Sequence, residues 1–410
     1  MSNKDLLMVT VSGPDKPGIA AALTRVMVEH GVEIVDLEQA SLQDLLGLSF
    51  LLDHPGEASA KDSFIKDLLF EAYRLGLALN FRFISEREVR KISQRHLFVL
   101  AFFGGVRAIA ELSAILGEEK VNIETVTSLT QPQANLVEMI INVDRTENLG
   151  RLKQRLMAKS RELNLDLALQ KSETYRKNKR LVFFDMDSTL LDMEVIDELA
   201  GRAGVHLEVA RITEKAMRGD FDYEESLRQR TALLKGLPEE ELADVRDNLR
   251  LSAGAKEVVT TLKRMGFKVG VVTGGFDYFA GHLQERLGLD FAFANQLEIK
   301  NGLLTGRIQG EVLDGARKAR LLNQVTQQEG FLLDQTVAVG DGANDALMLG
   351  QAGLGIAYNA KPVLDRAANG ALGRSRLMNI LYLLGITEED VARAMEAVPP
   401  LTRNSIQEDR

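Results

Sequence analysis

Hydrophobic and polar residues follow a pattern along the first 170 residues that occurs twice. In its first copy, short apolar runs that predict strands and amphipathic segments that predict helices follow the order βαββαβ. The predicted strands cover 5–12, 32–42, 46–53 and 77–85, and the predicted helices cover 19–30 and 61–75. This order predicts a ferredoxin-like module.

The same order returns between residues 96 and 170. A shift of 89 residues places Ile34 on Ile123 and Leu23 on Leu112, although few other side chains agree. We interpret this pattern as an internal duplication, with modules at 1–88 and 89–170. Residues 171–180, KSETYRKNKR, are basic and have no hydrophobic period. They are expected to form a solvated linker.

From residue 181 the pattern changes to α/β. The valine-rich runs LVFF, FKVGVVT and TVAVG are continuously apolar, which is typical of parallel strands covered on both faces. They end at Asp185, Thr273 and Asp341 respectively. Because parallel sheets carry their sites at the carboxyl ends of strands, these side chains are expected to meet.

The side chains expected at this edge could support phosphoryl transfer. They are Asp185, Asp187, Thr273, Gly274, Lys318, Asp341, Asn344 and Asp345. Carboxylates without Cys or His form an oxygen-only site that suits Mg²⁺. A lysine facing such a site indicates an anionic substrate such as a phosphate ester. Asp185 could attack phosphorus, while Asp187 could protonate the leaving alcohol and later accept a proton from water.

Composition narrows the possible classes of function. The 410 residues are 45% hydrophobic and 27% charged, which suits a globular chain of two to four domains. A net charge of −9 argues against nucleic acid or anionic membrane as a partner. The absence of cysteine excludes disulfides and thiolate metal sites. No secretory signal or membrane span is visible, so a cytoplasmic location is expected.

Four motifs in order carry a resemblance to a known family. DMDST, Thr273, Lys318 and GDGAND are similar to the motifs of the haloacid dehalogenase (HAD) superfamily of phosphohydrolases. Residues 180–375, including VVTGGFDYF, resemble the phosphoserine phosphatases within it. The resemblance implies a HAD-like Rossmannoid sheet over 181–390, with a small helical cap over 192–252. It also implies Mg²⁺-dependent hydrolysis of O-phospho-L-serine, the last step of L-serine biosynthesis.

The resemblance also implies a role for each site residue. Asp185 would be the nucleophile and an Mg²⁺ ligand, and Asp187 the general acid/base, with its main-chain carbonyl on the metal. Asp341 would be the third protein ligand, and Asp345 would orient the metal shell. The expected phosphate-binding residues are Thr273 (where the family usually has serine), Gly274, Lys318 and Asn344. In the cap, Glu194 would bind the substrate ammonium and Arg230 its carboxylate, with Met217 and Tyr223 nearby.

The two N-terminal modules resemble ACT domains, on the turn GPDKPGI and the strand VEIVDLEQ. This resemblance implies an amino-acid effector such as L-serine at Asp15 and Gly18, and a homodimer. The second repeat has Gly104 and Arg107 at those two places, so ligand binding there stays open. Dimerisation alone is the alternative role for the modules. Residues 391–410 are predicted to be a disordered tail.

Two other functions stay open on the residues alone. One keeps the chemistry and changes the substrate to a phosphorylated protein or another small phosphomonoester. The other is a non-catalytic amino-acid sensor on a phosphatase scaffold. Such a sensor is expected to have lost Asp185, Asp187 or Lys318, and all three are present.

Overall fold

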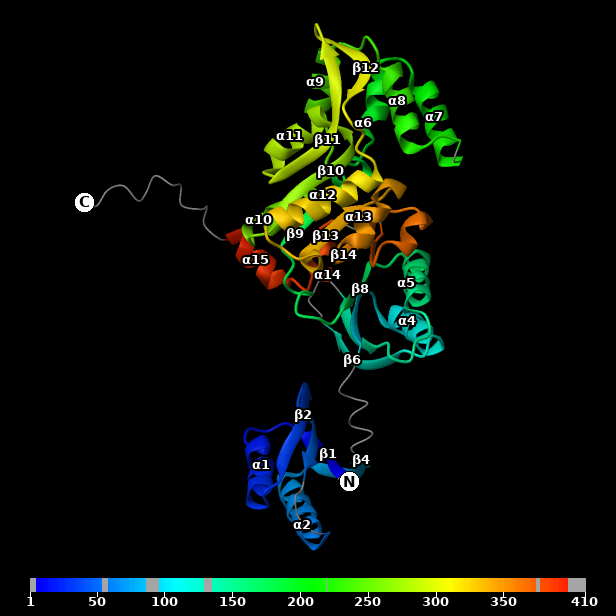
Figure 1. The fold of residues 1–410 in the computed structure, drawn as a ribbon. Coiled ribbons are helices and arrows are strands. Elements are labelled where there is room, and N and C mark those ends of the chain that lie inside the picture. Colours follow the sequence, from blue (N-terminus) through cyan, green and yellow to red (C-terminus); the bar gives the residue numbers. More distant parts are fainter. Residues whose placement is uncertain are drawn as a thin grey trace, which may run out of the picture. The chain divides into compact units, whose positions relative to one another are not determined.

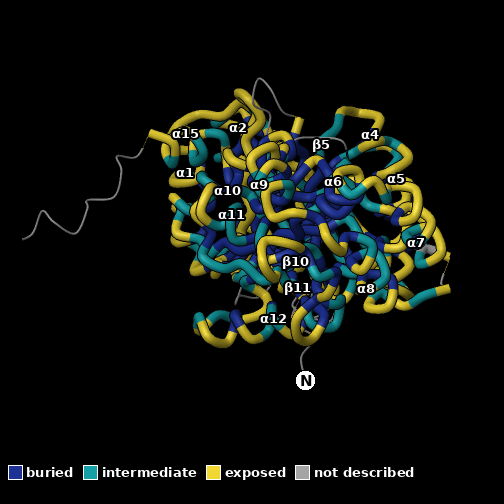
Figure 2. Tube along the Cα trace, turned by 90° about the horizontal axis from the view of Figure 1, so that it is seen from above, coloured by how far each residue is buried: buried dark blue, intermediate teal, exposed yellow. Residues whose placement is uncertain are grey.

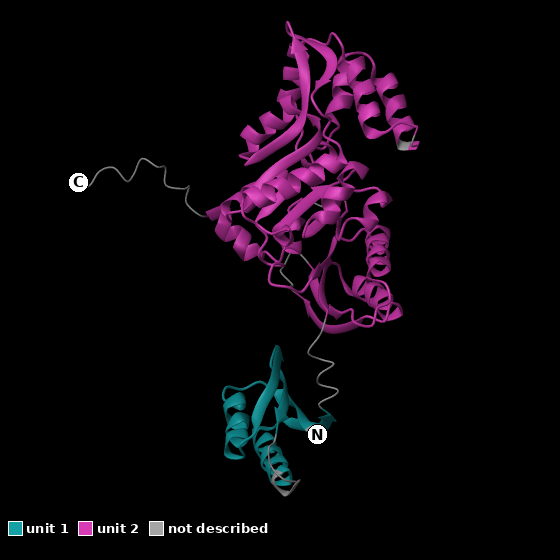
Figure 3. Ribbon diagram, in the orientation of Figure 1, with its two compact units in different colours: residues 1–95 teal, residues 96–410 magenta. Residues whose placement is uncertain are grey.

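The computed structural model describes residues 5–53, 58–85, 96–128, 135–218, 220–373 and 377–396, apart from the side chains of residues 58–60 and 217. The chain forms two compact units, residues 1–95 and 96–410, shown in different colours in Figure 3. Each unit is described by itself.

The first unit is a four-stranded antiparallel sheet with two helices. Its elements are β1 (Asp5–Pro14), α1 (Ile19–Glu29), β2 (Glu33–Leu42), β3 (Leu45–Asp53), α2 (Ala58–Leu75) and β4 (Ala78–Ser85). The strand order β2-β3-β1-β4 is that of a ferredoxin-like module. Val9, Leu23 and Phe64 are fully buried in one hydrophobic core. The predicted βαββαβ fold is therefore confirmed.

The second module repeats this order, but its sheet is continuous with that of the α/β region. It comprises β5 (Leu97–Phe103), α4 (Val106–Glu118), β6 (Asn122–Ser128), β7 (Leu136–Asn142), α5 (Leu149–Leu163) and β8 (Leu167–Lys171). Strand β8 pairs antiparallel with β15 (Gly370–Leu372), with Ala168 opposite Gly370. One sheet of eleven strands therefore runs through the second unit (Figure 1).

The remaining strands of this sheet form the α/β core. They are β9 (Leu181–Phe184), β10 (Lys268–Phe276), β11 (Phe291–Lys300), β12 (Leu303–Gln309), β13 (Thr336–Gly340) and β14 (Leu354–Tyr358). Strand β9 lies at the centre, parallel to β10 on one side and β13 on the other. Every residue of β9, β13 and β14 is buried, as expected for strands covered on both faces.

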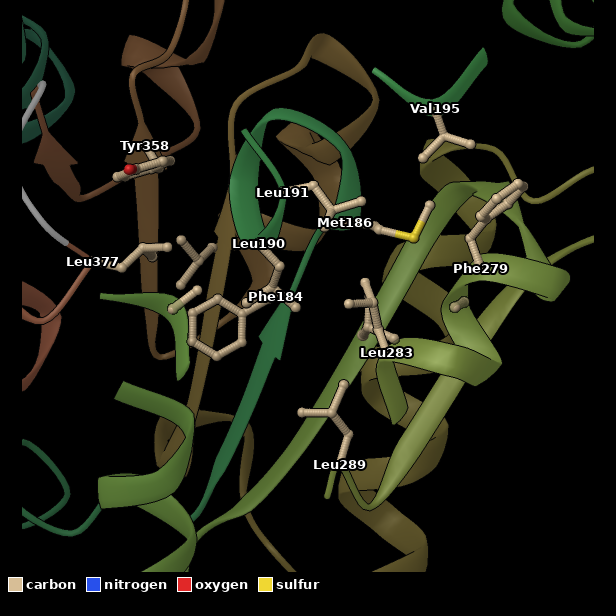
Figure 4. Close-up of a cluster of buried hydrophobic side chains, with 14 of the residues drawn as sticks. Phe184, Met186, Leu190, Leu191, Val195, Phe279, Leu283, Leu289, Tyr358 and Leu377 are labelled. Carbon is tan, nitrogen blue, oxygen red and sulfur yellow. The ribbon is translucent and has the colours of Figure 1, made fainter. Parts of the chain in front are cut away.

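Helices cover both faces of the core. They are α10 (Ala255–Arg264), α11 (Asp277–Leu287), α12 (Gly315–Gln328) and α13 (Ala346–Gln351). On one face Phe184 packs with Leu283 of α11, and Figure 4 shows both side chains in one cluster with Met186. On the other face Phe183 packs with Leu322 of α12. Successive side chains of β9 therefore point to opposite faces of the sheet, as the two-residue period of a strand requires.

Four helices of the cap lie between β9 and β10 in the sequence. They are α6 (Val195–Arg202), α7 (His206–Arg218), α8 (Tyr223–Leu233) and α9 (Glu239–Asp247). Helix α6 contacts the other three, and α8 contacts β12. Figure 2 shows that α7 is largely exposed, whereas β10 is largely buried. The helices fall within the range 192–252 predicted for a cap.

Two expectations need correction. The basic stretch 171–180 is not fully solvated, since Arg176 and Lys179 are only 8% and 6% exposed. The tail predicted from residue 391 begins with order, because helix α15 (Glu388–Glu396) follows α14 (Asn379–Leu383). Arg264 donates a hydrogen bond to the carbonyl of Met395 at 2.6 Å, which anchors α15. Residues 397–410 lie outside the described part. Among the described helices, none combines the length and apolar character of a membrane span.

Candidate active site

Asp185 stands at the carboxyl end of the central strand β9 and is 5% exposed. Its N–H donates to the carbonyl of Val339 at 2.9 Å, which continues the pairing of β9 with β13. Its Oδ1 accepts from the N–H of Met186 at 2.8 Å and lies 2.9 Å from Lys318 Nζ. The strand and these contacts hold the carboxylate at the edge of the sheet.

Lys318 lies on α12, fully buried between two carboxylates. Its Nζ is 2.9 Å from Asp185 Oδ1 and 2.7 Å from Asp345 Oδ1. Burial alone would lower the pKa of Lys318, but the charges of Asp185 and Asp345 raise that pKa above its usual range. The side chain is therefore a fixed cation. A Cβ at residue 340 would lie 2.4 Å from the Asp345 carboxyl, so glycine is needed there.

Three carboxylates converge at this edge from two strands. Oxygens of Asp185, Asp341 and Asp345 all lie within 4.8 Å of one another. Burial, followed by the charge of Asp185, raises the pKa values of Asp341 and Asp345 to about 7. Thr189 Oγ1 donates to Asp341 Oδ1 at 3.2 Å. A hard divalent cation fits this oxygen-only donor set and would relieve its repulsion.

Asp345 is itself a member of this cluster, and both of its carboxylate oxygens already accept hydrogen bonds. One of its oxygens accepts from Lys318 Nζ and the other accepts from the N–H of Gly342 at 3.1 Å. These two bonds occupy the carboxylate. They are compatible with the expected role, in which Asp185 and Asp341 supply the metal-binding side chains.

Asp187 lies near Asp185 in an environment that favours its protonated form. Its Oδ1 accepts from the N–H of Val195 at 3.0 Å, and a Cβ at Gly275 would lie 2.7 Å from its Oδ2. Burial and then the charge of Glu194 raise its pKa well above the usual value. A desolvated carboxylic acid of this kind can donate a proton to a leaving group at neutral pH.

Ser188 and Thr189 were not singled out in the sequence, although both stand in the DMDST motif. Ser188 has a φ of +54°, a left-handed conformation that is uncommon for a residue other than glycine. Its hydroxyl donates to Glu194 Oε1 at 2.6 Å. The turn therefore links the strand end to the cap. Their spacing in the motif gave no signal for these two hydroxyl contacts.

The carboxyl-terminal part of β10 brings together side chains that are expected to bind phosphate. Thr273 Oγ1 accepts from the N–H of Gly275 at 2.9 Å. A Cβ at Gly274 would lie 1.7 Å from the Tyr223 hydroxyl and 3.7 Å from Asn344 Nδ2. The glycine thus permits the cap tyrosine and the Asn344 amide to approach the same backbone segment.

The cap supplies two opposite charges near these groups. Glu194 precedes α6, and burial raises the pKa of its carboxyl group while the Ser188 hydrogen bond opposes that rise. Arg230 on α8 is half-buried, and its Nε donates to the carbonyl of Ser226 at 3.4 Å. The charge of Arg230 also lowers the pKa of Glu194. The expected position of Met217 falls outside the described side chains.

The proposed effector residues of the first module border a cavity of about 490 Å³. Asp15 and Gly18 both line it, and Asp15 accepts a hydrogen bond from the Ser41 hydroxyl at 2.8 Å. Gly18 has a φ of +94°, and nothing lies within 4 Å of a Cβ built on it. In the second module a Cβ at Gly104 would lie 2.5 Å from that of Ala108. The backbone is open at Gly18, whereas it is tightly packed at Gly104, the residue that the 89-residue shift places on Asp15.

Comparison with known proteins agrees with this arrangement. Residues 179–353 match the haloacid dehalogenase-like hydrolase family, and residues 5–82 match an ACT domain. The phosphoserine phosphatase of Streptomyces coelicolor is 40% identical over 396 residues, which cover 96% of this chain and 95% of the relative. The chain belongs to the phosphoserine phosphatase family.

Other members of the family agree in length and fold. Phosphoserine phosphatase SerB2 of Mycobacterium tuberculosis is 39% identical, and the match covers 96% of each chain. The solved structure of a probable phosphoserine phosphatase from Vibrio cholerae, in unliganded form, is 34% identical with a TM-score of 0.54. That match covers 73% of this chain and 89% of the other.

Proposed function

We propose that this member of the phosphoserine phosphatase family hydrolyses O-phospho-L-serine to L-serine and phosphate. The observation that carries the proposal is the pair Asp185 and Asp187. Asp185 Oδ1 lies 2.9 Å from the Lys318 ammonium, and the raised pKa of Asp187 keeps a proton within reach. The two carboxyl groups can therefore act as nucleophile and acid in one turnover.

The chemistry follows from the placement of these two carboxyl groups. A carboxylate oxygen of Asp185 forms a bond to phosphorus, the bond to the serine oxygen breaks, and Asp187 donates its proton to that oxygen. Asp187 then accepts a proton from the water that attacks the aspartyl-phosphate, which releases phosphate and restores Asp185. Side chains of Asp185 and Asp341, with the Asp187 main chain, would hold Mg²⁺. When bound, the metal supplies positive charge opposite the phosphoryl oxygens.

Specificity for a serine ester rests on the cap. The carboxylate of Glu194 would pair with the substrate ammonium, and the guanidinium of Arg230 would pair with the substrate carboxylate. Lys318, Thr273 and the Asn344 amide would hold the phosphate. A substrate without an amino acid group would use only this second set.

Phosphate release from O-phospho-L-serine, measured with and without Mg²⁺, tests the activity. We expect turnover only with Mg²⁺, and a loss of at least about a thousandfold in Asp185→Asn, because the amide is no nucleophile. Turnover by Asp185→Asn at the wild-type rate would contradict the mechanism.

A substrate panel tests the specificity. Arg230→Ala is expected to raise KM for O-phospho-L-serine by roughly a hundredfold, from the loss of a charge-assisted contact, and to change hydrolysis of p-nitrophenyl phosphate little. An equal loss on both substrates would favour another phosphomonoester or a phosphoprotein as substrate.

We also propose that the first ACT module binds L-serine at the cavity beside Asp15 and Gly18, in a cytoplasmic homodimer. The open turn at Gly18 supports this proposal. Asp15→Ala is expected to abolish any effect of L-serine on activity while leaving activity without serine unchanged. An unaltered serine effect would leave dimerisation as the role of the module.

A further inference from the structure

Asn295 of β11 is a polar residue that is only 2% exposed and has no part in the proposed catalysis. Its Nδ2 donates a hydrogen bond to the carbonyl of Gly274 at 2.8 Å, and its Oδ1 accepts one from the N–H of Leu313 at 2.7 Å. A carbonyl can only accept and an N–H can only donate, so these partners fix the orientation of the amide. The side chain thus joins a segment that precedes it in the sequence to one that follows it.

The bond to Gly274 holds a part of β10 in which the strand pairing is irregular. Residues 273–275 of β10 stand opposite the single residue Ala294 of β11, so the register of the parallel pair shifts there. Thr273 and Gly274, both expected to bind phosphate, lie in this segment. The Asn295 amide therefore supports the backbone of the phosphate-binding segment where regular pairing is interrupted.

The bond to Leu313 holds the start of α12, the helix that carries Lys318. Leu313 is 1% exposed and directly precedes Asp314, the residue that caps this helix. The Asp314 side chain accepts from the N–H of Arg317 at 2.7 Å, and its carbonyl accepts from the N–H of Lys318 at 2.9 Å. Lys318 therefore belongs to the first turn of the helix, and a displacement of Leu313 would move it.

The start of α12 also contacts the segment that carries Asn344. A Cβ built at Gly315 would lie 2.7 Å from the carbonyl oxygen of Asn344, so glycine permits this close approach. The start of the helix is thus linked to Gly274 through Asn295 and packed against Asn344 directly. Three groups expected to hold phosphate, on Gly274, Lys318 and Asn344, are therefore placed relative to one another by this arrangement.

We propose that Asn295 is a positioning residue for phosphoryl transfer, which sets the spacing between the Gly274 backbone and the start of α12. The inference rests on the proposed function, in which Gly274 and Lys318 hold the phosphate of the substrate. Asn295 would act through these groups and not on the substrate itself. A misplacement of about 1 Å caused by a substitution away from the chemistry can cost about a hundredfold in rate.

Steady-state kinetics of Asn295→Ala at saturating Mg²⁺ test the proposal. We expect kcat to fall by about a hundredfold for O-phospho-L-serine and for p-nitrophenyl phosphate, because both substrates share the phosphate group. Gln170→Ala is the matched control, since Gln170 is a buried amide of the same unit whose Nε2 donates to the carbonyl of Leu383 at 3.0 Å. This control removes a comparable bond outside the site, and its kcat is expected to change less than twofold.

Thermal unfolding of each variant gives a temperature at which all of them are folded, and kcat is compared there. If Asn295 only stabilises the fold, Asn295→Ala and Gln170→Ala will both keep the wild-type kcat, which would overturn the proposal. A loss confined to O-phospho-L-serine would also overturn it, because such an effect belongs to recognition by the cap.

A second variant serves if Asn295→Ala does not fold. Asn295→Asp keeps the shape of the side chain and the acceptor for Leu313, but replaces the donor to Gly274 with an acceptor. We expect at least a tenfold fall in kcat for both substrates, and a wild-type value would contradict the proposal. Wild-type turnover of p-nitrophenyl phosphate without turnover of O-phospho-L-serine would refute the proposed substrate, whereas the comparison of the Asn295 variants would still be decided on p-nitrophenyl phosphate.

Discussion

Two buried lysines lie near opposite ends of strand β13 and differ in their partners. Lys318, beside the loop that follows β13, is held between the carboxylates of Asp185 and Asp345. Lys179 lies beside the residues that precede β13, and its ammonium group donates a hydrogen bond to the backbone carbonyl of Asp334. The pKa of Lys318 is raised, whereas the pKa of Lys179 is lowered to about 8.

The comparison shows that burial alone does not fix the behaviour of an ionisable group. Both side chains lose their hydration, and desolvation is the largest influence on each. Two carboxylates within 3 Å reverse its effect on Lys318. The catalytic edge, with its excess of carboxylates, therefore suits a cation, whereas Lys179 loses its proton more readily than an ordinary lysine. This contrast can be tested in order of expected effect.

The largest effect is expected from Lys318→Met. Loss of the ammonium leaves Asp185 and Asp345 buried together without a cation, which costs about 3–5 kcal/mol of unfolding free energy without Mg²⁺. Hydrolysis should also fall by at least about a thousandfold, because Lys318 no longer offsets the substrate charge. Urea unfolding and phosphate release measure the two effects. Retention of wild-type stability would show that the two carboxylates are neutral in the folded protein.

The second effect is a pH dependence that belongs to Lys179. Its pKa is about 8 in the folded protein and 10.5 ordinarily, so the unfolded chain binds more protons between these values. Stability from this group therefore rises as pH rises from about 8 to 10.5, by about 3 kcal/mol in total. The difference in unfolding free energy between the wild type and Lys179→Met isolates this contribution. A difference that is constant over this range would contradict the lowered pKa.

The third effect is stabilisation by Mg²⁺. Saturation at a hundred times the dissociation constant is expected to add about 2.7 kcal/mol to the unfolding free energy. Asp341→Asn, which removes one of the converging carboxylates, should abolish most of this gain, whereas Lys177→Met should retain it. Thermal unfolding with added Mg²⁺ or EDTA measures the difference. Equal gains in both variants would place the metal elsewhere.

The smallest effect is expected from Lys179→Met at pH 7. Removal of the desolvated charge stabilises the folded state, while loss of the hydrogen bond to the Asp334 carbonyl opposes it. We expect the unfolding free energy to rise by about 1 kcal/mol in phosphate-free buffer. The catalytic activity is expected to equal that of the wild type. The change is thus opposite in sign to that of Lys318→Met. A loss of stability would mean that the hydrogen bond outweighs the buried charge.

Much of the catalytic edge was predictable because it depends on local patterns. The buried strand β9 and the residues directly after it place Asp185, and the GDGAND motif places Asp341 after β13 in the same way. Parallel strands then bring these ends together whatever the details of packing. The βαββαβ order of both modules was likewise visible in hydrophobic periodicity.

The basic stretch 171–180 shows what a local pattern could not reveal. Its composition resembles a solvated linker, yet Arg176 and Lys179 are buried because β8 pairs with β15, about two hundred residues later in the sequence. Likewise, no spacing predicted that Ser188 would contact Glu194, since that contact depends on a left-handed turn. The sequence by itself determined the family, the strand ends and their chemistry. Only the tertiary structure decided which charges are compensated, because long-range packing sets the hydration and partners of each group.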